Sequence, residues 1–128
     1  MITSHVIYDM LTRIKNGILA KKPFVVISNN KLNLKILNII YKENYIKHYT
    51  LINKNEIRVF LKYYDNRSHI KSLKVFKLQK NSIFLSLSQL WKFNLYDKLV
   101  LLSTSKGLLT GIMCKKNKVG GKLLCIFE

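Results

Sequence analysis

Three consecutive hydroxyl side chains and a lysine follow a short apolar run late in the chain. The run LVLL ends at Leu102, and Ser103, Thr104, Ser105 and Lys106 come directly after it. Buried hydroxyls would each need a hydrogen-bond partner, whereas exposed hydroxyls can both donate to and accept from a ligand. The stretch therefore forms a catalytic turn, a recognition turn or an ordinary turn whose hydroxyls bond its own backbone.

The spacing Ser103-x-x-Lys106 is that of the nucleophile in penicillin-binding proteins and β-lactamases, where the serine opens a helix. Here the pattern follows a strand-like run, Gly107 comes straight after the lysine, and the partner motifs Ser-Asp-Asn and Lys-Thr-Gly are absent. None of the six acidic residues is placed as a pair, so general acid–base catalysis has little to use. We therefore expect no enzyme, no cofactor and no small-molecule substrate, and the alternative of a Ser-Lys hydrolase would require labelling of Ser103 by an acylating probe.

A recognition turn fits the residues better than a catalytic one. Hydroxyls can meet base edges and ribose 2′-OH groups of RNA. Lys106 can contact a phosphate, while Gly107 and the pair Gly120-Gly121 allow close approach of a ligand to the backbone. On composition alone, an ordinary turn explains the same residues equally well.

The charge of the chain indicates a polyanionic partner. Twenty-three basic and six acidic residues give a net charge of +17 over 128 residues. Residues 1–64 carry 11 basic and 3 acidic side chains, and residues 65–128 carry 12 and 3, so the charge is not confined to a tail. Such an excess repels itself unless a polyanion neutralises it. No apolar run is long enough to span a membrane, so no membrane association is expected.

The cysteines and the start of the chain give weaker information. Cys114 and Cys125 lack the spacing of a zinc site or a disulfide framework, so reduced thiols in a reducing compartment are expected. No cleavable signal pattern is present, and a helix predicted to start close to Met1 leaves no room for a transit peptide. We expect the protein to work in the compartment where it is made.

The first half of the chain predicts the order helix, strand, helix, strand, strand. Apolar residues recur at helical spacing near the start, where Thr3 or Ser4 can cap a helix. FVVI (24–27) predicts a strand, and the pair Asn29-Asn30 can cap a second helix. NYIKHYTLI and EIRVFLKYY flank the sequence NKN and predict a hairpin. The expected buried faces of the two helices consist of Ile7, Met10, Leu11, Ile14 and Ile18, then Leu32, Ile36, Ile39 and Ile40.

The second half predicts mainly strands, in IKSLKVF, SIFLSL, LVLL and LLCIF. LSQLWKF predicts a short helix, and Thr110 can cap a single-turn helix that carries Lys115 and Lys116. The turn DNRS, residues 65–68, separates the halves. The expected class is α+β with two small packed domains, an α-β-α-β-β domain over 1–64 and a mainly β domain over 65–128.

Several of these motifs together resemble one family. STSKGLLTG, the basic pair after it and VGGKLLCIFE are similar to the C-terminal signature of the small-subunit ribosomal protein number eight family. YDMLTRIKNG resembles the first helix of that family, and KLNLKILNIIYKENYI resembles its second helix and following strand. The matches keep the family's order and nearly its spacing over essentially the whole chain.

The resemblance implies a structural constituent of the small ribosomal subunit that binds the central domain of its rRNA at an irregular helix. Neighbouring small-subunit proteins are further expected partners. A free-standing RNA chaperone or translational repressor with the same fold would instead fail to sediment with small subunits at high salt. The implied RNA-binding residues of the mainly β domain are Ser103, Thr104, Ser105, Lys106, Gly107, Lys115, Lys116, Gly120, Gly121, Lys122 and Phe84. Those of the first domain are Arg13, Lys15, Asn16 and Lys31.

The sequence departs from the family pattern at several points. LQKNSIF replaces a Pro-Gly pair and its basic neighbours, with Phe84 at the aromatic position, so residues 78–82 are expected to contact RNA less tightly. Lys122 replaces the family's Glu, Gly111 its Asp and His5-Val6 its Asp-Pro. Relaxed motifs, the dominance of lysine over arginine and the absence of a transit peptide favour a mitochondrially encoded member. An AT-rich bacterium or a plastid is the alternative source.

Overall fold

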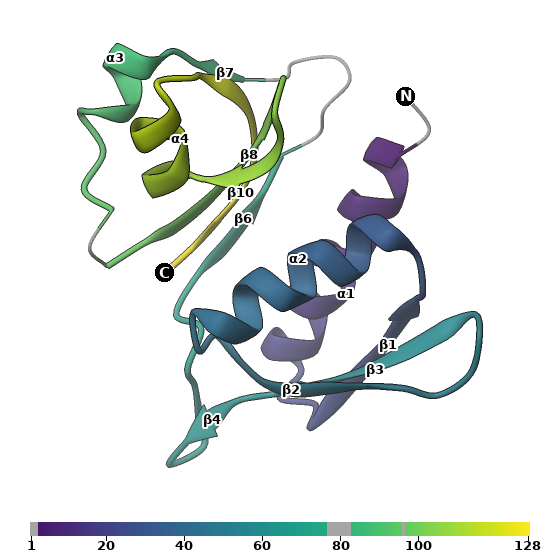
Figure 1. Ribbon diagram of the computed structural model, residues 1–128. Helices are drawn as coiled ribbons and strands as arrows, with labels where there is room; N and C mark the ends of the chain where they lie inside the picture. The colour runs from purple at the N-terminus through teal and green to yellow at the C-terminus, as the bar shows by residue number, and fades with distance from the viewer. Residues whose placement is uncertain (1–2, 77–82, 96) are drawn as a thin grey trace. The chain divides into compact units, whose positions relative to one another are not determined.

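The chain divides into two structural units. The computed structural model describes residues 3–76, 83–95 and 97–128. The N-terminal unit spans Met1–Lys71 and the C-terminal unit spans Ser72–Glu128 (Figure 1). The predicted boundary after residue 64 falls inside the N-terminal unit, because a small hairpin pairs residues from both sides of that boundary.

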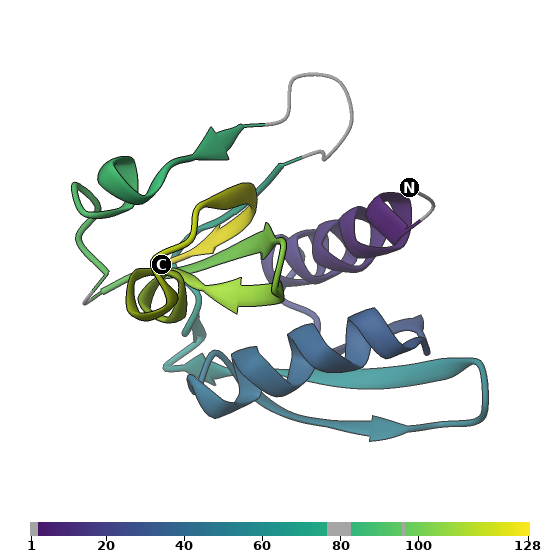
Figure 2. The ribbon, with the colours of Figure 1, turned by 45° about the horizontal axis from the view of Figure 1, so that its top comes forward.

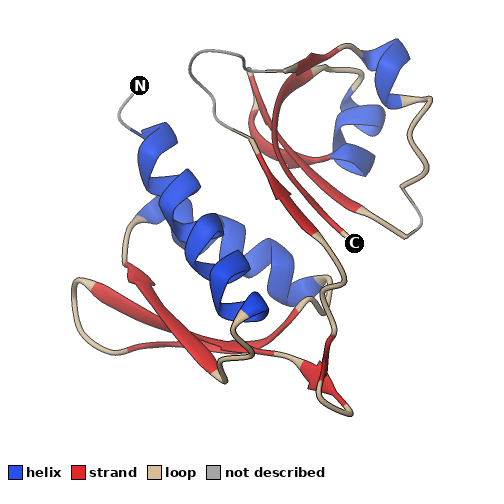
Figure 3. Ribbon diagram, turned by 180° about the vertical axis from the view of Figure 1, so that it is seen from behind, coloured by secondary structure: helices blue, strands red, loops and turns tan. Residues whose placement is uncertain are grey.

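The N-terminal unit consists of two helices on one face of a three-stranded antiparallel sheet, as Figures 1 and 3 show. The sheet order is β1-β3-β2, so the last strand lies in the middle. This confirms the predicted order of helices and strands. The elements are α1 (Thr3–Leu19), β1 (Phe24–Ser28), α2 (Lys31–Lys42), β2 (Ile46–Leu51) and β3 (Glu56–Leu61).

Hydrophobic periodicity accounts for most of the core of this unit. Alternate residues of β3 are buried, as expected for a strand with one face against helices. Of the predicted face of α2, Ile36 and Ile40 are buried, whereas Leu32 and Ile39 are only half-buried. The rest of that face is formed by Leu37 and by Asn33, which was not expected because it is polar.

Asn33 is fully buried, and the end of β1 gives its side-chain N–H a hydrogen-bond partner, while its Oδ1 has no partner among the described residues. Its side-chain amide donates to the carbonyl oxygen of Ser28 at 2.9 Å. Its backbone N–H donates to the side chain of Asn30, the predicted N-cap of α2, also at 2.9 Å. Asn33 thus joins the start of α2 to the strand before it.

A small hairpin follows β3 and includes the predicted turn. It joins β4 (Tyr63–Tyr64) to β5 (Arg67–Ser68). Asp65 and Asn66 connect the two strands with φ values of 50° and 64°, the left-handed conformation that two-residue hairpin turns require and that Asp and Asn tolerate. The run EIRVFLKYY is therefore two strands rather than one.

The C-terminal unit is mainly β, with β10 at the centre of its sheet. The main order is β6-β10-β8-β9, and β7 also pairs with β10. The core cluster on one face of this sheet contains Leu85, Leu102, Cys114 and Leu123. Its elements are β6 (Leu73–Val75), β7 (Phe84–Leu85), α3 (Leu87–Leu90), β8 (Leu99–Thr104), β9 (Gly107–Thr110), α4 (Gly111–Asn117) and β10 (Gly121–Phe127).

Three details of this unit differ from the sequence predictions. The strand predicted for LVLL continues through Ser103 and Thr104, and an unpredicted strand, β9, pairs with it. The helix after Thr110 has seven residues, about two turns rather than one. The predictions for residues 78–82 and for the N-cap side chain of α1 lie outside the described residues and side chains.

Candidate RNA-binding surface

The tip of the β8–β9 hairpin carries the hydroxyl residues singled out in the sequence (Figure 2, green). Thr104 pairs with Gly107, so only Ser105 and Lys106 form the turn between the strands. Gly107 has φ of 102°, and a Cβ atom there would have nothing within 4 Å. Glycine is therefore required by backbone conformation, and the space beside it is open.

The three hydroxyls have different roles in this hairpin. The Thr104 hydroxyl donates to the carbonyl oxygen of Gly107 at 2.8 Å and accepts from the backbone N–H of Lys106 at 3.1 Å. The hydroxyls of Ser103 and Ser105 make no hydrogen bond to any described residue. Thr104 therefore stabilises the turn, and the two serines keep their hydrogen-bonding capacity for a ligand.

Strand register places residues distant in sequence side by side. Phe84 on β7 pairs with Lys122 on β10, Lys122 pairs with Ser103 on β8, and Ser103 pairs with Leu108 on β9. Directly paired residues share one face of a sheet, so these four form a cross-strand row. The sheet brings together an exposed aromatic ring, an exposed cation and a hydroxyl.

The cross-strand row lies on the face of the sheet opposite the core cluster. Leu85, Leu102 and Leu123 are neighbours of row residues along their strands, and all three belong to that cluster. Because successive residues of a strand point to opposite faces, the row points the other way. The side chain of Phe84 is 61% exposed.

The glycine pair at the start of β10, Gly120 and Gly121, serves a contact inside the protein. A Cβ atom at Gly120 would lie 2.5 Å from the carbonyl oxygen of Leu85, and one at Gly121 would lie 2.6 Å from that of Ser103. No side chain fits at these distances, so both glycines let neighbouring backbone approach. The sequence alone does not show that β7 and β8 flank the pair, and the approach of a ligand to this backbone stays a prediction.

Helix α4 lies on the core side of the sheet and not on the side of the row, because its Cys114 belongs to the core cluster. Thr110 caps this helix as predicted, since its hydroxyl accepts from the backbone N–H of Met113 at 3.2 Å. The Lys115 ammonium lies 4.7 Å from the centre of the Trp91 ring, a cation–π contact. Lys116 is exposed. The structure therefore does not place these two lysines on the face that carries the row.

The other candidate residues lie on the helices of the N-terminal unit. Arg13, Lys15 and Asn16 are exposed on the C-terminal half of α1, and Lys31 is the first residue of α2. The Arg13 guanidinium donates to the carbonyl oxygen of Val26 at 3.0 Å. Arg13 and Asn16 also line an open groove of about 720 Å³ beside β1. The Arg13 guanidinium thus has one hydrogen-bond partner within the unit.

Internal pairing compensates little of the positive charge. Within the described part of the chain, the only ion pair joins Lys98 to Glu128 at 3.5 Å, and both side chains are about one-third exposed. A partly exposed pair of this kind contributes little to stability. No described carboxylate therefore neutralises the other described lysines and arginines.

The geometry does not support the Ser-Lys nucleophile considered from the sequence. Ser103 lies in β8 and Lys106 in the exposed turn, whereas the enzyme motif places both on one helix.

Burial raises the pKa of both the Cys114 and the Cys125 thiols, so they are poor nucleophiles. Among the described residues, no cluster of three or more histidine, cysteine and acidic side chains could hold a metal ion. No described helix is long and apolar enough to cross a membrane.

Sequence reasoning missed β9 and the cross-strand row. The signal for β9 was weak, because GLLT is short and follows a lysine and a glycine. The row depends on which strand pairs with which, and no local pattern encodes that choice. Strand-forming residues stand on both sides of Ser105 and Lys106, and this pattern is the sequence signal that indicates a hairpin.

The chain is similar to ribosomal proteins of one family over almost its whole length. The family model for ribosomal protein S8 matches residues 5–127. A small ribosomal subunit protein uS8 from Buchnera aphidicola subsp. Acyrthosiphon pisum (strain 5A) is 34% identical over 119 residues, covering 91% of this chain and 92% of that protein. The uS8 protein of Borrelia turicatae is 33% identical over 130 residues, covering 98% of each chain. That of Mesomycoplasma hyopneumoniae (strain 7448) is 38% identical over 120 residues, covering 92% of each.

Proposed function

The chain belongs to the ribosomal protein S8 family, and from that premise we propose where it binds ribosomal RNA and with which residues. It is a structural constituent of the small ribosomal subunit that binds rRNA and is not an enzyme. The proposed target is an irregular helix with bulged bases in the central domain of that rRNA. The observation that carries the proposal is the hairpin tip beside the cross-strand row, where unpaired hydroxyls, cations and an exposed ring share one sheet.

Each group on this surface suits a different part of RNA. The hydroxyls of Ser103 and Ser105 can bond base edges and 2′-OH groups, which an irregular helix exposes. Lys106 and Lys122 can neutralise phosphates, and the ring of Phe84 can stack on an unpaired base. Thr104, Gly107, Gly120 and Gly121 hold the hairpin and its neighbours in the shape that presents those groups.

The remaining candidate residues act as secondary phosphate contacts in this proposal. Lys116 and Lys115 would reach RNA from the helix side of the sheet. Lys15 and Lys31 on the N-terminal unit would add affinity with little discrimination, as would Arg13 and Asn16. Phosphate contacts of this kind position a protein but do not read sequence or shape.

We propose the mitochondrial ribosome as the location. The support is the composition, with 20 lysines and 3 arginines, and the departures from the family pattern at Lys122 and Gly111. The relatives named above are bacterial proteins. Mass spectrometry of small subunits from purified mitochondria and from the remaining cell fraction tests this location. Recovery of the chain only outside mitochondria would contradict it.

Binding of the full-length chain to two RNAs tests the proposed target. One RNA is the central-domain helix with its bulges, and the other is the same helix with every base paired. We expect the bulged RNA to bind at least about tenfold more tightly, which corresponds to about 1.4 kcal/mol. Equal affinity for both would show that charge alone drives binding, and the reading role of the hairpin tip would be wrong.

A further inference from the structure

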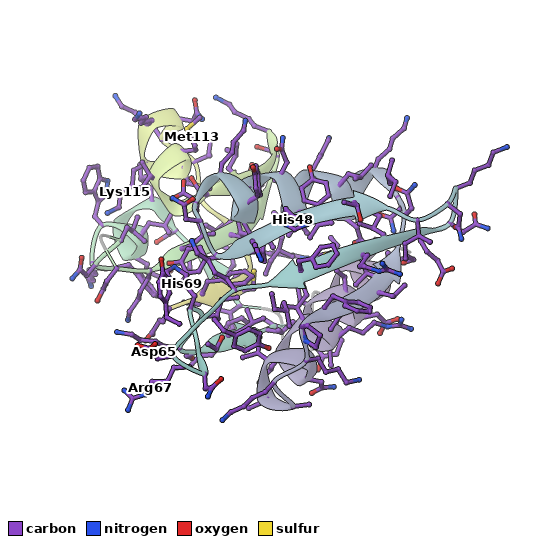
Figure 4. All side chains as sticks on the ribbon, turned by 90° about the horizontal axis from the view of Figure 1, so that it is seen from below. His48, Asp65, Arg67, His69, Met113 and Lys115 are labelled. Atoms are coloured by element: carbon purple, nitrogen blue, oxygen red, sulfur yellow. The ribbon has the colours of Figure 1, made fainter. Side chains whose placement is uncertain are left out.

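The sheet of the N-terminal unit has two edge strands that differ in regularity. Its order, β1-β3-β2, leaves β1 and β2 at the edges. On β2 the register with β3 shifts between Ile46 and His48, the latter labelled in Figure 4. Such an irregularity makes an edge a poor template for a further strand. In contrast, β1 keeps one unbroken register with β3 from Phe24 to Ser28, so β1 is the more regular edge.

Every second residue of β1 directs its backbone groups away from β3. The N–H of Asn29, just beyond the strand, donates to the carbonyl oxygen of Asn55 at 2.9 Å. Because bonded pairs alternate along antiparallel strands, Val25 and Ile27 are the residues of β1 that bond to β3. The remaining residues of β1 point their N–H and C=O groups to the free edge, and they are Phe24, Val26 and Ser28.

Each of the two helices donates one side-chain hydrogen bond to this free edge. The guanidinium of Arg13 on α1 donates to the carbonyl oxygen of Val26 at 3.0 Å, and the amide of Asn33 on α2 donates to that of Ser28 at 2.9 Å. Asn33 is fully buried, whereas Arg13 is exposed. The Asn33 bond therefore belongs to the packing of the unit, and the Arg13 bond lies at the surface, where a further strand would arrive.

The sequence of β1 favours pairing with another copy of itself. The stretch FVVISNN, residues 24–30, contains no charge and no proline, and it begins with an aromatic and three β-branched residues. Such a segment at a sheet edge is a template for strand addition. Two identical strands can pair antiparallel about a twofold axis, so that each supplies the same groups to the other. An open groove of about 720 Å³ beside β1 leaves room for the added strand.

We propose that Arg13 guards this edge and keeps the free chain from pairing through β1 with a second copy of itself. The guanidinium occupies the Val26 carbonyl oxygen that a partner strand needs. An arriving strand would have to displace the guanidinium or bury its charge, and burial of an unpaired charge costs more than one backbone hydrogen bond contributes. Charged side chains protect many sheet edges in this way. The proposal concerns the chain without RNA and does not depend on where RNA binds.

Methionine at Arg13 or at Lys15 of the full-length chain tests the guard. Both substitutions remove one positive charge from an exposed position of α1, but the Lys15 side chain makes no hydrogen bond to any described residue. Sedimentation velocity is measured without RNA over a concentration series in about 1 M salt, where a Debye length of about 3 Å screens self-repulsion. We expect Arg13→Met to dimerise at a concentration at least about tenfold lower than Lys15→Met or the unsubstituted protein. Equal association of the two variants would show that loss of charge alone is responsible, and the guard would be wrong.

Amide hydrogen exchange shows where the Arg13→Met copies meet. In the dimer, the N–H groups of Phe24, Val26 and Ser28 should exchange at least about tenfold more slowly than in the monomer, because they donate to the partner strand. Dimers without this protection, or the absence of dimers at every concentration, would overturn the proposal. Circular dichroism should show the same fold for both variants, since both side chains are exposed. If Arg13→Met alone lost its fold, the bond to Val26 would be a stability contact and not a guard.

Discussion

At the scale of single residues, the adjacent hydroxyls of the hairpin tip differ in whether the fold itself uses them. Thr104 uses its hydroxyl as donor and acceptor within the turn. Ser103 and Ser105 are not needed for that purpose, because the two bonds of Thr104 already satisfy the exposed backbone groups of Lys106 and Gly107. The ordinary-turn interpretation therefore applies to Thr104, and the recognition-turn interpretation stays a prediction for Ser103 and Ser105.

Substitution of Ser105 and substitution of Lys106, the two turn residues of the hairpin, should change RNA affinity in different patterns. Ser105→Ala should leave an RNA group unpaired and cost about 1–3 kcal/mol on the bulged RNA, with a smaller loss on a regular duplex. Lys106→Ala should weaken both RNAs by similar amounts, since each offers a phosphate. Filter binding of both variants to both RNAs measures this difference. Equal losses from Ser105→Ala on the two RNAs would falsify the reading role.

The hydroxyl of Thr104 should matter for stability more than for recognition. Thr104→Val removes two hydrogen bonds of the turn and should lower the free energy of unfolding by about 1 kcal/mol. Thr104→Ser keeps the hydroxyl and is the matched control, with a much smaller expected loss. Urea denaturation measures both. A larger loss of bulged-RNA affinity in Thr104→Val than in Ser105→Ala would reverse the roles assigned here.

At the scale of elements, the close contact of β10 with β7 and β8 fixes the cross-strand row. The pairing of Lys122 with both Phe84 and Ser103 requires three strands to converge at the start of β10. Gly120 and Gly121 make that approach possible, because backbone atoms occupy the places of their missing side chains. The packing of strands thus determines which candidate residues share a surface.

Alanine substitutions at Gly121 and Gly107 should distinguish the stability cost of steric crowding from that of a positive φ. Gly121→Ala would place Cβ against the carbonyl oxygen of Ser103 and should cost about 2–3 kcal/mol, because backbone must move. Gly107→Ala meets open space and is opposed only by its positive φ, so the expected loss is about 1–2 kcal/mol. Thermal or urea unfolding ranks the two. A greater loss in Gly107→Ala would contradict the close approach of β10 to β8.

At the scale of the whole molecule, the large positive charge favours a protein whose surface contacts a polyanion. The net charge is +17, and the described part of the chain contains a single ion pair. Compact folding brings these cations closer together, so an isolated chain suffers self-repulsion that RNA relieves. Both units carry candidate phosphate contacts, so we expect the neutralisation to extend beyond the hairpin tip.

Binding should accordingly depend steeply on salt. If about six lysines contact phosphates, the slope of log affinity against log salt should be near −5, taking roughly −0.9 per contact as for duplex DNA. Removal of one contact by Lys106→Ala should make the slope shallower by about one contact's worth. Filter binding over a salt series gives both slopes. A flat response would contradict the electrostatic account of the charge.

The sequence by itself determined the local elements and the family. Helix and strand periods, the caps Asn30 and Thr110, and the hairpin around NKN are set by residues close in the chain, and each is present in the structure. The motif STSKG and the net charge of +17 favour RNA as the partner, and both are properties of the sequence alone. These features need no knowledge of what packs against them.

Only the tertiary structure decided which residues meet. Phe84, Lys122 and Ser103 become neighbours because β10 pairs with β7 on one side and with β8 on the other. The close approach at Gly121 likewise depends on β8, a strand distant in sequence. Strand pairing is a competition among all possible partners in the chain, so no short stretch of sequence contains its outcome.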